Sequence, residues 1–221
     1  MDMPISTRTL AEARQAILSQ LPEDTVLIAA SKRQPDARIE AALAAGHRVF
    51  GENRVQEAGM RWRHRRAAYP DLALHLIGPL QTNKADAAVC LFDVIHTLDR
   101  PKLLNALIKA QARTGAAPPD LFIQVNTGAE PQKAGIHIDA LDPLVTSTQD
   151  MWPGKLLGLM CIPPAEEPAA PHFALLKRLA DQYGLAAISM GMSQDYALAA
   201  QLGATHVRVG TALFGARDAS A

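Results

Sequence analysis

One lysine stands where an amine could do chemistry. Lys32 follows the apolar run VLIAAS, which ends at Ser31, and it precedes Arg33. An amine at the rim of an apolar core, beside a second cation, is shifted toward its neutral and nucleophilic form, which can condense with a carbonyl group. The simpler interpretation is a lysine whose ammonium group reaches solvent from the end of a strand. Position alone favours that simpler interpretation.

Two glycine-containing turns late in the chain could hold an anion. The turn RVGTALFG contains Gly210 and Thr211, and the turn SMGMS contains Ser189 and Ser193. Glycine lets backbone N–H groups approach an anion closely, and hydroxyl groups add further donors. The alternatives are a packing glycine at Gly210 and an ordinary helix cap at Ser193. Because the two turns occur together, we favour phosphate binding.

Arg208 and Asn53 are further candidates for a binding site. Arg208 points inward if Val207 and Val209 face the helices. A buried guanidinium needs a partner, which could be a carboxylate, a ligand phosphate or a heteroaromatic nitrogen. Asn53 and Gln56 have the spacing of a helix cap pair, although Asn53 could still offer an amide edge to a ligand. A lysine amine near a phosphate site suits pyridoxal phosphate, and it also suits some phosphosugar aldolases.

The elements that must position these residues alternate between strands and helices. A capping box from Thr9 to Glu12 predicts an N-terminal helix. Eight apolar runs then alternate with helical patterns, and the predicted strands are 26–31, 47–51, 72–78, 94–98, 121–127, 155–162, 186–191 and 206–215. Strands that alternate with helices pair in parallel, and mostly apolar strands fit a sheet that is covered on both faces. We therefore predict an α/β fold consisting of a single (β/α)8 barrel.

An open doubly wound sheet is the alternative architecture. It would place a G-x-G-x-x-G loop after an early strand, whereas the first strand is followed by SKRQPD. In a parallel barrel, the C-terminal ends of all strands meet at one mouth. The polar residues at these strand ends would then converge on a single site.

Composition excludes several classes of protein. Because 22 Lys+Arg balance 22 Asp+Glu, the formal net charge is zero, which argues against a dedicated DNA-binding protein. The 48% hydrophobic content is too high for a disordered chain. Cys90 and Cys161 lie in apolar runs and are predicted to be buried thiols in a reducing compartment. The first residues lack the apolar segment of a signal peptide, and no run could span a membrane, so we expect a cytoplasmic protein.

The motifs together resemble those of the YggS/PROSC family, the pyridoxal phosphate homeostasis proteins. In order along nearly the whole chain they are AASKRQP, FGENRVQEA, HLIGPLQTNK, IHTLDR, QVNTGAEPQKAGI, GLMCIPP, SMGMSQDY and VRVGTALFGAR. The long motifs FGENRVQEA and SMGMSxD…VRVGTALFG are specific to this family. The departures at Ala30, Pro79 and Thr82 are minor and touch none of the proposed anchors.

The resemblance implies a single barrel domain over residues 1–221, similar to the N-terminal domain of alanine racemase. It implies pyridoxal 5′-phosphate held as an aldimine of Lys32, with no metal site. The other cofactor-binding residues that it implies are Asn53, Met160, Ser189, Ser193, Arg208, Gly210 and Thr211. It leaves open whether Arg208 faces the pyridine nitrogen or the phosphate.

The resemblance also implies a carrier in vitamin B6 homeostasis without an established reaction. Racemisation needs an acid/base group on each face of the substrate, and only Lys32 stands out. Tyr69 and Tyr183 precede strands, Tyr196 lies in a predicted helix, and His96 fits a half-buried residue that leads into a helix. We also expect that the few residues after the last strand leave no room for the second domain of a racemase. A small racemase or decarboxylase is the alternative.

A nucleic-acid or partner-binding module is the second alternative. The run RWRHRR (61–66) places four arginines around Trp62, and basic residues beside an aromatic ring can grip single strands. We favour a solvated helix end, where cations suit the C-terminal dipole, because nothing else in the chain extends the patch. The resemblance implies pyridoxal phosphate as the ligand and the apo-enzymes that use it as recipients. We expect no nucleic-acid or membrane partner, and a monomer.

Overall fold

The eight strands close into one parallel barrel in the computed structural model, which describes residues 9–215. The strands are β1 (Val26–Ala30), β2 (Val49–Glu52), β3 (Ala73–Leu76), β4 (Val94–Leu98), β5 (Asp120–Val125), β6 (Leu156–Cys161), β7 (Ala187–Met192) and β8 (His206–Val209). Each strand pairs with the next in the sequence, and β8 pairs with β1 from Val26↔His206 to Ala29↔Val209. The predicted (β/α)8 barrel is confirmed, and the open doubly wound sheet is wrong.

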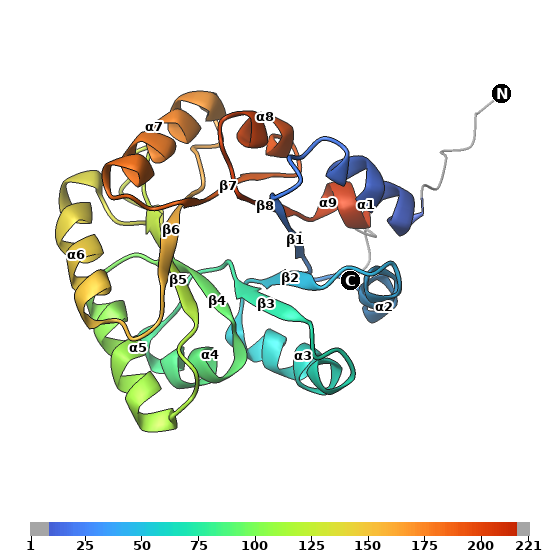
Figure 1. Ribbon diagram of the computed structural model, residues 1–221, viewed down its shortest axis with the longest axis horizontal. Coiled ribbons are helices and arrows are strands. Elements are labelled where there is room, and N and C mark those ends of the chain that lie inside the picture. The colour runs from blue at the N-terminus through green and yellow to red at the C-terminus, as the bar shows by residue number, and fades with distance from the viewer. Residues whose placement is uncertain (1–8, 216–221) are drawn as a thin grey trace.

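Helices and short 3-10 turns surround the barrel, and all but α1, before β1, and α9, after β8, connect successive strands (Figure 1). They are α1 (Leu10–Leu18), α2 (Asp36–Ala44), α3 (Val55–Ala68), η1 (Thr82–Lys84), α4 (Ala85–Leu91), α5 (Pro101–Thr114), η2 (Ile138–Ala140), α6 (Leu141–Met151), α7 (Ala169–Gln182), α8 (Tyr196–Gln201) and α9 (Thr211–Phe214). The N-terminal capping box is confirmed, because the Glu12 N–H donates to Thr9 Oγ1 and the Thr9 N–H donates to Glu12 Oε2.

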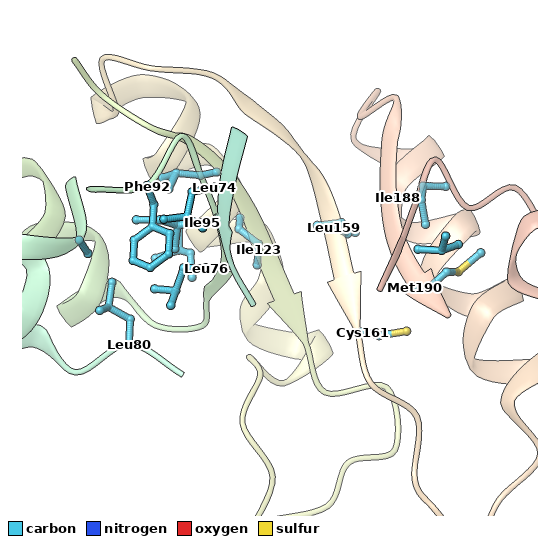
Figure 2. Packing of buried hydrophobic residues seen from close by; sticks show 14 of the residues in the cluster. Leu74, Leu76, Leu80, Phe92, Ile95, Ile123, Leu159, Cys161, Ile188 and Met190 are labelled. Atoms are coloured by element: carbon cyan, nitrogen blue, oxygen red, sulfur yellow. The ribbon is translucent and has the colours of Figure 1, made fainter. Parts of the chain in front are cut away.

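The main hydrophobic core lies between the strands and the helices and is largely aliphatic. Figure 2 shows Leu74, Leu76 and Ile95 of β3 and β4 gathered beside Phe92, with Ile188 and Met190 of β7 on another part of the sheet. The alternation along each strand sends the intervening residues into the barrel. The outward-facing residues pack against the helices, and the inward-facing residues fill the interior of the barrel.

The strand predicted over 206–215 is too long. In the structure β8 ends at Val209, and Thr211 begins the short helix α9. The run VRVGTALFG is apolar enough to read as one strand, yet the backbone turns at Gly210, which is the N-cap residue of α9. Gly210 and Thr211 therefore lie at the beginning of a helix, and not within a strand, at the mouth of the barrel.

The two thiols differ in exposure. Cys161 is fully buried, as predicted, but Cys90 is exposed near the end of α4, so that prediction is wrong for Cys90. Burial raises the pKa of the Cys161 thiol to about 12, which keeps it protonated. Within residues 9–215, no helix combines the length and the apolar character needed to cross a membrane.

Candidate functional site

A pocket of about 320 Å³ opens at the C-terminal ends of β1, β2, β7 and β8. Six of the eight residues predicted from the sequence line it, and they are Lys32, Asn53, Ser193, Arg208, Gly210 and Thr211. These residues come from loops and strand ends that the barrel closure between β8 and β1 brings together. The structure therefore gathers the predicted amine and residues of both predicted anion turns in a single wall, which we call the pocket wall.

Sequence reasoning missed other parts of the pocket wall. Ile77 and Ile162 supply apolar surface, and Gln34 and Asp195 add polar groups. Asp195 accepts a hydrogen bond from the Met192 N–H at 2.6 Å and so closes the turn that carries Ser193. A signal for Asp195 was available, because an aspartate three residues after a turn residue commonly accepts from its backbone N–H.

Two predicted residues lie elsewhere. Ser189 is fully buried in β7 and hydrogen-bonded to Arg208, so a direct phosphate contact from its hydroxyl does not fit its position. Met160 is also fully buried and packs against Val94 and Phe122, inside the barrel rather than on the pocket wall. Both residues point inward from their strands, at a level below the mouth.

Lys32 belongs to a short loop that a buried ionic cluster holds in place. Its own side chain is exposed, as the simpler interpretation of its position predicts. Arg61 donates to the Ser31 carbonyl oxygen at 2.8 Å and to the Gln34 carbonyl oxygen at 3.0 Å. These two carbonyl groups flank Lys32 on both sides. The helix α3 thus fixes the backbone from which the lysine amine reaches the pocket.

Glu52 is the centre of this cluster. Its side chain is fully buried at the end of β2, and its Oε1 atom accepts hydrogen bonds from Ser31 Oγ at 2.8 Å, Trp62 Nε1 at 2.9 Å and Arg61 Nη1 at 3.1 Å. A buried carboxylate requires such partners, because an unpaired charge in the interior is very costly. We call Glu52, Arg61, Trp62 and Ser31 the lysine-loop clamp.

The run RWRHRR therefore serves the fold. Trp62 is fully buried, Arg65 pairs with Glu40 at 2.7 Å, and Arg66 pairs with Asp93. The interpretation as a solvated helix end holds only in part. Arg65 and Arg66 do lie in the last turn of α3, but Arg61 and Arg65 are largely buried, and all three arginines bind carboxylates of neighbouring elements. The same pairing removes most of the free positive charge that an exposed nucleic-acid-binding patch would need.

The two anion turns meet at Ser193. Its Oγ atom accepts hydrogen bonds from the backbone N–H groups of Gly210 at 3.1 Å and Ala212 at 3.4 Å. The predicted helix cap at Ser193 is wrong, because α8 begins at Tyr196 with Asp195 as its N-cap residue. A Cβ atom at Gly210 would meet only Ala30, at ordinary contact distances of 3.5 and 3.6 Å. Packing therefore does not require glycine at this position of the pocket wall.

Asn53 reaches the pocket wall through a close contact between two loops. The predicted cap pair with Gln56 is wrong, because α3 begins at Val55 and its N-cap residue, Arg54, makes no side-chain cap bond. A Cβ atom at Gly78 would lie 2.3 Å from the Asn53 carbonyl oxygen, so only glycine permits this approach. The loop after β3 thus supports the loop that carries Asn53.

Arg208 points into the barrel, as predicted, and is buried where it lines the pocket. Its Nη1 donates to Ser189 Oγ at 2.6 Å, and its Nη2 donates to the Cys161 carbonyl oxygen at 2.8 Å. Burial lowers the pKa of Arg208, which the nearby Cys161 and Asp195 partly oppose. Both hydrogen-bond partners are neutral, so the guanidinium keeps its positive charge without a hydrogen-bonded carboxylate among the described residues.

Buried histidines make the stability of the folded chain dependent on pH. Burial lowers the pKa of His75 to about 3 and the pKa of His206 to about 4. The unfolded chain has histidine pKa values near 6.5, so it takes up protons that the folded chain refuses as the pH falls below 6.5. The stability is therefore fully present above pH 6.5 and decreases below it, by about 1.4 kcal/mol per pH unit for each such histidine.

We expect the urea midpoint of unfolding to fall markedly between pH 7 and pH 5. His47 has a pKa lowered by burial to about 4, and the variant His47→Gln should make the decrease less steep. The variant His64→Asn, which changes an exposed side chain, serves as the control and should leave the slope unaltered. An equal midpoint at the two pH values would show that these histidines do not stay neutral in the folded chain.

Comparison with known proteins gives consistent relatives. Residues 6–218 match the family described as "Alanine racemase, N-terminal domain". The chain is 41% identical over 216 residues to the pyridoxal phosphate homeostasis protein of Pseudomonas aeruginosa, covering 95% of this chain and 91% of the relative. It is 37% identical over 209 residues to the protein of that name from Escherichia coli K12, covering 90% and 88%. PipY of Synechococcus elongatus PCC7942, solved with PLP bound, is 39% identical with a TM-score of 0.86, covering 93% of this chain and 100% of PipY.

Proposed function

This chain belongs to the alanine racemase N-terminal domain family, and from that premise we propose that it binds pyridoxal 5′-phosphate and serves vitamin B6 homeostasis. The resemblance to pyridoxal phosphate homeostasis proteins that its motifs carry is confirmed by relatives of that name. One observation carries the proposal. The Lys32 amine, the backbone N–H groups at the start of α9 and the Arg208 guanidinium share one pocket wall.

The residues of the pocket wall fit the parts of this cofactor. Its aldehyde supplies an electrophile that condenses with a primary amine, and Lys32 offers such an amine. The N–H group of Gly210 and the hydroxyl groups of Ser193 and Thr211 are donors suited to a phosphate. These N–H groups already point at an oxygen atom, that of Ser193, which is the kind of acceptor that a phosphate also presents. Arg208 would bring a positive charge to the same ligand.

Apolar contacts would hold the ring of the cofactor. Ile77 and Ile162 line the same pocket, and Asn53 adds an amide group beside them. The pocket is concave and largely apolar, with a few convergent polar groups, as is usual for a cofactor site. The open position of Lys32, whose side chain is exposed, would let the cofactor enter and leave.

We further propose that the chain is a carrier rather than a catalyst. Apart from Lys32, the acid/base group of the pocket wall, as far as the structure describes it, is Asp195. The Oδ1 atom of Asp195 accepts from the Met192 N–H, which ties this carboxylate to the turn. A racemase needs a proton donor and acceptor on both faces of the reacting carbon, and this wall supplies one free amine.

Exchange of the α-proton tests the carrier proposal against the racemase or decarboxylase alternative. Protein loaded with the cofactor is incubated with single amino acids in deuterated water, and deuterium incorporation and product formation are followed by NMR. We expect incorporation at no more than the rate of free pyridoxal phosphate at the same concentration. Incorporation or decarboxylation at roughly 1 s⁻¹ or faster, within the normal range of enzymes, would contradict the carrier proposal.

A further inference from the structure

A line of four hydrogen-bonded side chains crosses the interior of the barrel and ends at the pocket. His75 Nδ1 lies 2.9 Å from His96 Nε2, and His96 Nδ1 lies 2.9 Å from Ser189 Oγ. Ser189 Oγ in turn receives the hydrogen bond from Arg208 Nη1 at 2.6 Å. We call His75, His96, Ser189 and Arg208 the interior chain. Three of its members have no part in the pocket wall, so the proposed site does not account for them.

The interior chain joins strands that are distant around the barrel. His75 and His96 come from β3 and β4, whereas Ser189 and Arg208 come from β7 and β8. The hydrogen bond from β4 to β7 therefore spans the interior rather than following the sheet. His96 and Ser189 are fully buried, and the His96 ring stacks on Phe122 with centroids 4.4 Å apart. His96 was predicted to be half-buried and to lead into a helix, which is wrong.

The direction of every hydrogen bond in the interior chain follows from Arg208. A guanidinium group only donates, so Ser189 Oγ accepts from Arg208 and has its own proton left to donate. His96 Nδ1, 2.9 Å from Ser189 Oγ, is in position to accept that proton. His96 must then carry its proton on Nε2 and donate it to His75 Nδ1. In this arrangement both histidines are neutral and hold their proton on Nε2, and all three hydrogen bonds run head to tail.

This alignment matters because Arg208 is held from below at two atoms. Its Nη1 is bound to Ser189 Oγ, and its Nη2 is bound to the Cys161 carbonyl oxygen. A hydroxyl group that donates toward His96 presents its lone pairs to Arg208, whereas a hydroxyl group without that acceptor is free to rotate. The hydrogen bond to His96 thus fixes the orientation of the Ser189 hydroxyl group, whose oxygen accepts from Arg208.

We propose that His96, supported by His75, is a positioning residue that fixes the Arg208 guanidinium under the pocket through Ser189. His96 is not among the residues that line the pocket, and it acts through the interior chain. The proposal rests on the proposed function in one respect, which is that an immobile Arg208 should strengthen cofactor binding. The orientation of Arg208 itself can be measured in the protein without any ligand.

NMR of the ligand-free protein provides the direct test. Long-range ¹H–¹⁵N spectra should show His75 and His96 as neutral rings protonated on Nε2, and restricted rotation should give separate ¹⁵Nη signals for Arg208. In His96→Leu, which removes the acceptor, we expect these Nη signals to merge. His96→Asn, whose side-chain oxygen can replace Nδ1 as the acceptor, should keep them separate. A proton on His96 Nδ1, or Arg208 signals that stay separate in His96→Leu, would overturn the proposal.

A matched variant separates positioning from packing. The ring of His206 also lies near those of His96 and His75, with centroids 6.0 and 6.3 Å apart, but its hydrogen bond is to Thr205 Oγ1 and not to a member of the interior chain. His206→Leu should therefore leave the Arg208 signals unaltered. If His96→Leu does not fold, Ser189→Ala removes the same link at a small residue and should merge the signals in its place. Separate Arg208 signals in Ser189→Ala would contradict the proposal.

Cofactor affinity is the second readout. Loss of one neutral hydrogen bond that orients Arg208 should weaken binding of pyridoxal phosphate by about 3- to 10-fold in His96→Leu, with His96→Asn and His206→Leu closer to the wild type. Equal affinity in all these variants would overturn the positioning role for the cofactor. If the wild type fails to bind pyridoxal phosphate, the proposed function fails, while the NMR result still decides whether His96 holds Arg208.

Discussion

Lys32→Ala is expected to lose nearly all of the pyridoxal phosphate that borohydride can fix to the wild-type protein. The reason is chemical, because fixation requires a primary amine beside the aldehyde, and Lys32 is the amine of the pocket wall. Without it, the donors of Ser193 and Gly210 would still attract the phosphate, so we expect weak and fully reversible binding. The measurement is the visible absorbance of the loaded protein before and after borohydride, followed by dialysis.

Two further variants separate the amine from its charge and its location. Lys32→Arg keeps a cation but removes the nucleophile, so it should behave like Lys32→Ala. Lys84→Ala is the control, because Lys84 belongs to a neighbouring pocket and not to the pocket wall. It should retain full fixation. Fixed cofactor at wild-type levels in Lys32→Ala would refute the assignment of the amine.

Glu52→Ala is expected to destabilise the folded chain by about 3–5 kcal/mol, because it removes the fully buried partner of a largely buried ion pair. The substitution removes the shared acceptor of Ser31, Arg61 and Trp62, and the Arg61 side chain is only 19% exposed. Urea unfolding followed by circular dichroism measures the loss. Because the lysine-loop clamp also holds the backbone on both sides of Lys32, folded Glu52→Ala protein should capture pyridoxal phosphate more slowly than the wild type.

An exposed ion pair at the start of α3, the helix that carries Arg61 and Trp62, provides the comparison. Glu57 pairs with Arg54 at 3.1 Å, and the Arg54 side chain is 77% exposed. Pairs of this kind contribute about 0–1 kcal/mol, so Glu57→Ala should unfold nearly as the wild type does. Similar decreases in the free energy of unfolding for Glu52→Ala and Glu57→Ala would show that the buried position of Glu52 adds no stability to the clamp. If folded Glu52→Ala protein captures pyridoxal phosphate as fast as the wild type, the lysine-loop clamp does not position Lys32.

The barrel was predictable because its pattern is repeated and local. Eight apolar runs separated by helical patterns specify parallel strands, and the closed sheet follows from their number. Errors arose at boundaries where a local signal competes with a tertiary one. Asn53 and Ser193 both have the spacing of helix caps, but contacts from distant loops, through Gly78 and through Gly210, determine their positions instead.

The site was predictable only at the level of strand ends. Knowing that Lys32 and Gly210 follow the first and last strands was enough to bring them to one mouth. The roles of buried polar residues were not predictable, because they depend on partners far away in the sequence. Glu52 and Arg61 attracted attention as parts of motifs or of a basic run, and only the packing of α3 against β2 shows them holding the lysine loop.

Peptide mapping of the borohydride-reduced, cofactor-loaded protein tests the central claim most directly. The measurement locates the lysine that carries the reduced cofactor by tandem mass spectrometry after proteolysis. We predict one modified residue, Lys32, at close to one cofactor per chain. A cofactor fixed mainly to another lysine, or no fixed cofactor at all, would contradict the proposal that Lys32 and the pocket wall around it hold pyridoxal phosphate.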